Sequence, residues 1–187
     1  MASGKDEEVP QGLSQVVEYR VDRRNVIISV GANWNTFAKE NNAASLLGDG
    51  VVGIPLHSFV AGDATRMFIE ALLRSARALG RPLVRPYRCD SPDCRRYMEM
   101  VLLPSPSGEV TLQHRVLREE RFTRPIGFRL SESGGAGVLI RCSMCNRLKG
   151  AHDWVDAETI AASDGRGSLP VIYGVCPACM ESIRGKR

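Results

Sequence analysis

Four cysteines near the end of the sequence have the type and spacing of metal ligands. They form two Cys-x-x-Cys pairs, Cys142 with Cys145 and Cys176 with Cys179, separated by thirty residues. Two residues between cysteines let one tight turn aim both sulfurs at a common point, and four thiolates bind Zn²⁺ in a closed tetrahedral site. The sequence therefore predicts one structural zinc ion per chain.

Other interpretations of these pairs stay open. They could be unrelated thiols, or one pair could be a redox motif, although such a motif needs a single pair and usually follows a strand in a thioredoxin-like unit. His152 lies between the pairs and could replace a cysteine. Four thiols already complete a tetrahedron, so we expect no histidine ligand.

The residues around the two pairs predict a small module that depends on its metal. Trp154 is the one tryptophan of this segment, so the apolar core is thin and zinc would supply much of the folding free energy. We expect strands at 138–140 and 169–173, a short helix at 156–162, a loop at 165–168, and a helix from 177 through 183.

Cys89 and Cys94 lie five positions apart across a predicted hairpin turn. They could form a second metal site, a redox-switchable disulfide or a thiol sensor. We favour two free thiols, because no histidine is near them in sequence to complete a metal site. If they react, Arg88, Arg95 and Arg96 would lower their pKa values and favour the thiolate.

The first two thirds of the chain predict an α+β domain. A long helix begins at Asp63 and stops at Gly80, and its apolar stripe consists of Ala64, Phe68, Leu72 and Leu79, with Met67 and Ala71 beside it. A short helix follows Asn33 and ends at 41–42. The predicted strands are 16–21, 26–30, 83–87, 97–103 and 110–117.

Several runs resemble bacterial PAS sensor proteins. In the first part these are YRVD, WNTFAKEN, VVGIPL and RCDSPDCRRYMEM. IRCSMCNRLKG, Trp154 and YGVCPACMESI resemble a cysteine module at the end of such sensors, with Asn146, Leu148 and Tyr173 departing from its usual pattern. The resemblance implies a PAS-like five-stranded antiparallel sheet with helices on one face, followed by a small zinc-nucleated module.

A PAS-like domain would hold a small ligand, or contact a partner, between its sheet and helices. His57 could be a haem ligand, as in some PAS domains, but a lone histidine beside Pro55 is more often structural; His114 is expected to face solvent. The candidate pocket-lining residues, each of which could equally belong to the core, are Trp34, Phe37, Phe59, Phe68 and Met100.

Composition indicates in which compartment the protein acts and in which state its cysteines are. The chain has 187 residues, 43% of them hydrophobic, with a net charge of +4. It contains neither the roughly 18 apolar residues of a membrane helix nor a signal peptide, so we expect a cytoplasmic protein. Six cysteines in a reducing compartment indicate metal binding or free thiols rather than disulfides.

We therefore predict a stand-alone, non-enzymatic sensory protein that signals through an unidentified partner or by forming a homodimer. No nucleophile elbow, phosphate loop or kinase core is present. One rival is a nucleic-acid-binding zinc regulator, disfavoured because few aromatic residues accompany the arginines; the other is a redox sensor using Cys89 and Cys94. The predicted divisions are a tail at 1–15, a PAS-like domain at 16–120, a linker at 121–137 and the zinc module at 138–187.

Overall fold

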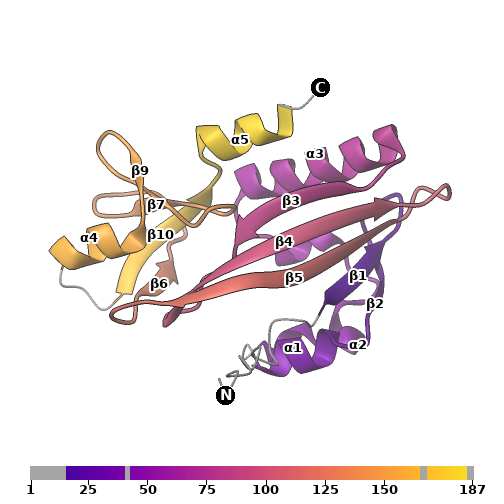
Figure 1. Ribbon diagram of the computed structural model, residues 1–187, viewed down its shortest axis with the longest axis horizontal. Coiled ribbons are helices and arrows are strands. Elements are labelled where there is room, and N and C mark those ends of the chain that lie inside the picture. Colours follow the sequence, from indigo (N-terminus) through magenta and orange to yellow (C-terminus); the bar gives the residue numbers. More distant parts are fainter. Residues whose placement is uncertain (1–15, 41–42, 165–167, 185–187) are drawn as a thin grey trace, which may run out of the picture.

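The computed structural model describes residues 16–40, 43–164 and 168–184, which form two sheets packed against each other (Figure 1). The predicted tail at 1–15, the end of the short helix at 41–42 and most of the loop at 165–168 lie outside these ranges. No helix within them is both long and apolar enough to cross a membrane.

The first sheet has five antiparallel strands in the order β2-β1-β5-β4-β3. The N-terminal hairpin therefore pairs through β1 with β5, the last strand of the sheet. This arrangement confirms the PAS-like sheet expected from the resemblance. The strands are β1 Val17–Val21, β2 Ile27–Val30, β3 Leu83–Arg88, β4 Cys94–Pro104 and β5 Val110–Arg121.

Helices connect β2 to β3 and cover one face of this sheet (Figure 1). The longest of them, α3, lies along β4 and β5 and ends at Gly80, whose φ of 59° is the left-handed conformation that glycine adopts readily after a helix. The helical segments are α1 Trp34–Glu40, η1 Ala44–Leu46, α2 Gly48–Val51, η2 Leu56–Phe59 and α3 Asp63–Leu79.

The buried face of α3 differs in part from the predicted stripe. Phe68 and Leu72 are buried as expected. Met67 and Leu79, however, are 69% and 51% exposed, and Thr65 is buried instead, together with Leu73 and Ala76. Thr65 is buried because its hydroxyl contacts that of Ser143 after β7, a contact that no local periodicity reveals.

The second sheet has the order β6-β10-β7-β8-β9, with β10 parallel to both of its neighbours. Gly127–Leu130, which we expected in a linker, forms the edge strand β6. The strands β6, β8 and β9 are short and lacked a sequence signal. The elements are β6, β7 Leu139–Cys142, β8 Leu148–Lys149, β9 Trp154–Val155, α4 Ala157–Asp164, β10 Ser168–Gly174 and α5 Pro177–Arg184.

The apolar core of the first sheet continues into the cysteine segment. Phe68 and Leu112 belong to the same buried cluster as Cys142, Met144 and Cys176. A second cluster on the other side of β10 packs α4 against the sheet, and contains Ile126, Leu148, Ala157, Ala161, Leu169 and Val171. The two sheets are therefore joined by shared apolar packing as well as by the chain.

Truncating Phe68 tests the assignment of the α3 face. Phe68→Ala should lower the free energy of unfolding by about 3–5 kcal/mol, because it leaves a cavity in a fully packed core. Met67→Ala, one residue away on the exposed face, should change it by about 0.5 kcal/mol or less. Urea denaturation of both variants provides the measurement, and equal effects would contradict the assignment of the buried face of α3.

Candidate metal centre and adjoining pocket

The sulfur atoms of Cys142, Cys145, Cys176 and Cys179 all lie within 4.8 Å of one another. The Sγ atoms of Cys145 and Cys176 are 3.8 Å apart. A tetrahedron with metal–sulfur bonds of about 2.3 Å has sulfur–sulfur edges of about 3.8 Å. The four predicted ligands therefore lie close enough together to form a tetrahedral thiolate site, and they could bind one metal ion.

The first pair lies in the turn between β7 and β8. The Asn146 N–H donates to the Cys142 carbonyl at 2.9 Å, and the Cys142 N–H donates to the Arg147 carbonyl at 2.8 Å, which closes the turn. Asn146 has a φ of 57°, a left-handed conformation that asparagine tolerates better than most residues. Asn146 thus fits the backbone that directs both sulfurs inward.

The second pair lies at the start of α5. Cys176 accepts the first helical bond, from the Met180 N–H at 2.9 Å, and Pro177 occupies the first turn as predicted. The Cys179 N–H points at the Cys176 sulfur and the Cys176 N–H at the Cys142 sulfur, both at 3.4 Å. Free N–H groups at a helix start favour thiolates over thiols.

The close approach of the thiols shifts their acidities apart. Hydrogen bonds from Cys145 and Cys179 lower the pKa of Cys142. The same contact with Cys142 raises the pKa of Cys145 to about 11, and also raises that of Cys179. One thiolate is thus stabilised by its neighbours, but four so close together require a cation to compensate their charge.

The remaining thiols and His152 lie apart from this cluster. His152 is exposed and is not among the grouped ligands. Cys89, exposed at the rim of the pocket described below, and the half-buried Cys94 are free cysteines. Desolvation raises the pKa of both thiols and outweighs the nearby Arg96, which is opposite to the lowering we expected from the arginines.

A buried group of charges joins the first sheet to the second. Arg88, 8% exposed, pairs with Asp90 and with Asp156 at 2.5 Å each. Beside it, Arg95 pairs with Glu158 at 2.7 Å. Although burial alone opposes ionisation, the hydrogen bond from Arg88 lowers the pKa of Asp156. Arg88 and Arg95 on the hairpin β3–β4 thus fix the segment that precedes and begins α4.

A pocket of about 400 Å³ lies where the two sheets meet. The interior face of the first sheet forms one wall, and the segment from η2 into α3 forms another. The turn after β7 and the end of β10 close the third side. The residues of these walls include Tyr19, Tyr87, Met100 and His114, then Phe59, Val60, Thr65 and Ile69, and finally Arg141, Ser143, Met144 and Tyr173.

Two close contacts set the position of the third wall. The hydroxyls of Thr65 on α3 and Ser143 in the cysteine turn are 2.5 Å apart. Gly62, before α3, has a φ of 82°, and a Cβ there would lie 3.1 Å from the Cβ and carbonyl oxygen of Tyr173. Glycine is required both by its backbone conformation and by this close approach.

His114 faces the pocket, contrary to our expectation that it faces solvent. It lies two residues beyond the buried Leu112, hence on the same face of β5. The Tyr87 hydroxyl hydrogen-bonds its Nδ1 at 2.8 Å, and its ring stacks on Tyr19 with centroids 5.6 Å apart. Desolvation lowers its pKa to about 4. The alternation of Val110, Leu112 and His114 was a signal that could have found it.

The five predicted lining residues are divided between the pocket and the core. Phe59 and Met100 line the pocket, whereas Phe68 is 2% exposed in the core cluster. Trp34 donates its Nε1–H to the Leu46 carbonyl at 2.6 Å, and Phe37 is half-buried on α1. The last three do not belong to the described lining of this pocket.

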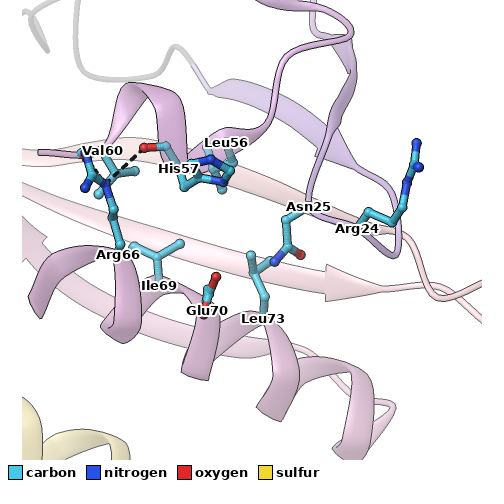
Figure 2. Close-up of a pocket in the computed structure, with 9 residues that line it drawn as sticks. All are labelled: Arg24, Asn25, Leu56, His57, Val60, Arg66, Ile69, Glu70 and Leu73. Carbon is cyan, nitrogen blue, oxygen red and sulfur yellow. Dashed lines mark hydrogen bonds between the residues drawn. The ribbon is translucent and has the colours of Figure 1, made fainter. Parts of the chain in front are cut away.

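His57, the candidate haem ligand, is exposed beside a much smaller pocket (Figure 2). This pocket has a volume of about 40 Å³ and lies between η2 and α3, where Arg66 donates to the carbonyls of His57 and Val60. A volume this small falls far below the roughly 300 Å³ of an ordinary ligand site. The geometry around His57 therefore does not favour haem.

No protein-family model matches the sequence, and no curated protein matches it. Several solved structures are similar in part, among them the following two. A domain of an HTR-like protein from Haloarcula marismortui ATCC 43049 is 19% identical, with a TM-score of 0.42 over 55% of this chain and 98% of that one. A sensory box sensor histidine kinase from Vibrio cholerae is 11% identical, with a TM-score of 0.41 over 56% and 83%.

The burial of His114 predicts a pH-dependent stability. Its pKa is lowered from 6.5 to about 4, so the unfolded chain binds a proton that the folded chain does not. Stability is therefore present above about pH 6.5 and should decrease by up to about 3 kcal/mol as the pH falls to about 4. His114→Gln, which cannot titrate, should have a flatter dependence of unfolding free energy on pH over this range.

The exposed His152 offers the matched control. His152→Gln should keep the pH dependence of the unmodified protein, since both proteins retain the buried imidazole and the same cysteine cluster. Urea denaturation at pH values between 4 and 7 measures all three. Equal slopes for His114→Gln and the unmodified protein would contradict the neutral, buried state of His114.

Proposed function

We propose that this chain is a PAS-like sensory protein whose pocket receives a small ligand and whose four cysteines hold a structural zinc ion. Signal output would pass to a protein partner or proceed through a homodimer. The observation that supports this most directly is the composition of the pocket. One side is the interior of the first sheet and the other is the cysteine segment, so a ligand there contacts both units at once.

Zinc is the metal that best suits the cysteine site. Four sulfurs within 4.8 Å of one another, on two buried and two half-buried cysteines, suit a closed structural site without an open position for catalysis. The surrounding N–H groups stabilise thiolate charge in the way such sites require. A structural role also agrees with the position of Cys142 and Cys176 in the main apolar cluster.

The nucleic-acid alternative is supported less well. The arginines that suggested it are mostly bound to acidic residues of the same hairpin and of the second sheet. A side chain engaged in an ion pair neutralises a phosphate only by losing that pair. The pairs are Arg88 with Asp90 and Asp156, Arg95 with Glu120 and Glu158, Arg96 with Glu119, Arg115 with Glu99, and Arg118 with Glu120.

The metal content tests the zinc proposal. Protein purified without chelators should contain one zinc per chain, and Cys176→Ser should lose it, because three thiolates leave the tetrahedron incomplete. Hydrogen exchange should then accelerate in residues 139–164 and 168–182 and around Thr65, where the cysteine turn contacts α3. Cys89→Ser removes a thiol outside the cluster and should retain the full zinc content. Protein that lacks zinc altogether would refute the assignment.

The ligand proposal is tested by a thermal-shift screen of small metabolites. A ligand at a hundredfold excess over its Kd should raise the free energy of unfolding by about 2.7 kcal/mol. Gly62→Ala and Gly53→Ala both place alanine at a positive φ, but only at position 62 does the new Cβ push against Tyr173. Gly62→Ala should therefore weaken binding more than Gly53→Ala. A screen without any stabilising compound would contradict the sensory proposal.

A further inference from the structure

One cation in the wall of the pocket has no acidic partner. Arg141 is 6% exposed, and no ion pair joins it to an acid among the described residues. It is paired with Tyr173 across β7 and β10, and its side chain lies over the ring of Phe128, with the guanidinium carbon 3.7 Å from the ring centroid. Its Nε remains buried without a hydrogen-bond partner.

The acidic residue in the pocket wall, Asp90, already accepts hydrogen bonds from neighbouring arginines. Asp90 accepts from Arg88 on both carboxylate oxygens, at 3.2 and 2.5 Å, and from the Arg96 N–H at 3.2 Å. Arg88 in turn is balanced by Asp156 as well. Arg141 is thus the arginine of this wall that forms no ion pair among the described residues, although Asp90 lies close enough for its charge to raise the pKa of Arg141 against the effect of burial. A buried unpaired charge is costly, and an anion that enters the pocket would relieve this cost.

A second polar atom of the pocket also lacks a hydrogen-bond partner. His114 Nε2 is buried without a partner, while Nδ1 is engaged by the Tyr87 hydroxyl. When that hydroxyl donates, the neutral imidazole carries its proton on Nε2 and can donate to a ligand. Arg141 and His114 come from different sheets, so both can serve one ligand only because the sheets meet at this pocket.

The rest of the lining is largely apolar. Met100 lies on the first sheet and Ile69 on α3, and Phe59 and Met144 extend this apolar surface. A single available cation in such a lining does not suit a nucleotide or a polyphosphate, which carry several charges. A volume of about 400 Å³ falls within the usual range for small-molecule sites.

We propose that the pocket binds a small organic acid with an apolar body, its carboxylate paired with Arg141 and its body placed between Ile69 and Met100. This proposal rests on the sensory function and names the class of ligand for it. Arg141 immediately precedes Cys142, so the carboxylate would be held next to the metal centre. Binding of a ligand in the pocket would therefore act directly on the cysteine turn.

Matched pairs of acids and amides test the proposal in the unmodified protein. Calorimetry would compare benzoate, phenylacetate and hexanoate with benzamide, phenylacetamide and hexanamide. At least one acid should bind about ten- to a hundredfold more tightly than its amide, the difference expected for a hydrogen-bonded charge pair. In NMR spectra of the protein carrying methyl-labelled methionine, the bound acid should shift the signals of Met100 and Met144 and leave the signal of the exposed Met67 unchanged.

Two variants test whether Arg141 supplies the positive charge that pairs with the carboxylate of the ligand. Arg141→Gln should remove the preference for the acid over the amide, whereas Arg129→Gln, an exposed arginine on β6, should keep it. The zinc content of both is measured, because Arg141 lies beside a metal ligand. If Arg141→Gln loses its metal, His114→Phe, which removes the imidazole donor while the metal ligands remain, should weaken acid binding instead.

Three results separate failure of this proposal from failure of the sensory function. If no acid binds more tightly than its amide, the ligand class is wrong. If neutral metabolites then stabilise the protein and shift the NMR signals of Met100 and Met144, the sensory function stands although the organic-acid proposal fails. If neither acids nor any metabolite of the screen bind, both are overturned.

Discussion

The meeting of two cysteine pairs that are distant in sequence is the constraint on which this structure depends. For four sulfurs to lie within 4.8 Å of one another, the end of β7 must lie beside the start of α5. β10, which leads into α5, is consequently parallel to β7, and Tyr173 pairs with Arg141 in register. The residues that close the pocket are thus near neighbours of the four clustered cysteines, and they are positioned by the same contacts.

The second sheet is held against the first by apolar packing, while charges determine its orientation. Phe68 and Cys142 share one buried cluster, which supplies most of the driving force for association. Arg88 contributes differently, since a buried ion pair adds little net stability but is strongly unfavourable when one partner is lost. Its bonds to Asp90 and Asp156 therefore favour one arrangement of the hairpin and α4 over others.

The pocket combines an interior typical of a sheet covered by helices with polar groups that such an interior seldom contains. Tyr19, Tyr87 and His114 lie on the inner face of the first sheet, where desolvation keeps the imidazole neutral. Arg141 enters from the other sheet. Each would be unfavourable in a closed core. Their convergence on one cavity leaves these polar groups at the wall of a pocket rather than in a closed core.

Local sequence was sufficient for most elements and for the four cysteines that cluster, because helix periodicity, Gly80 and the Cys-x-x-Cys spacing each depend on neighbouring residues alone. It also contained the alternation that places His114 beside Leu112. Tertiary structure alone decided the rest. Gly127–Leu130 becomes a strand only because β10, some forty residues later, offers it a partner. Arg141 and His114 line one pocket only because the two sheets pack together, and no spacing along a chain encodes the packing of separate sheets.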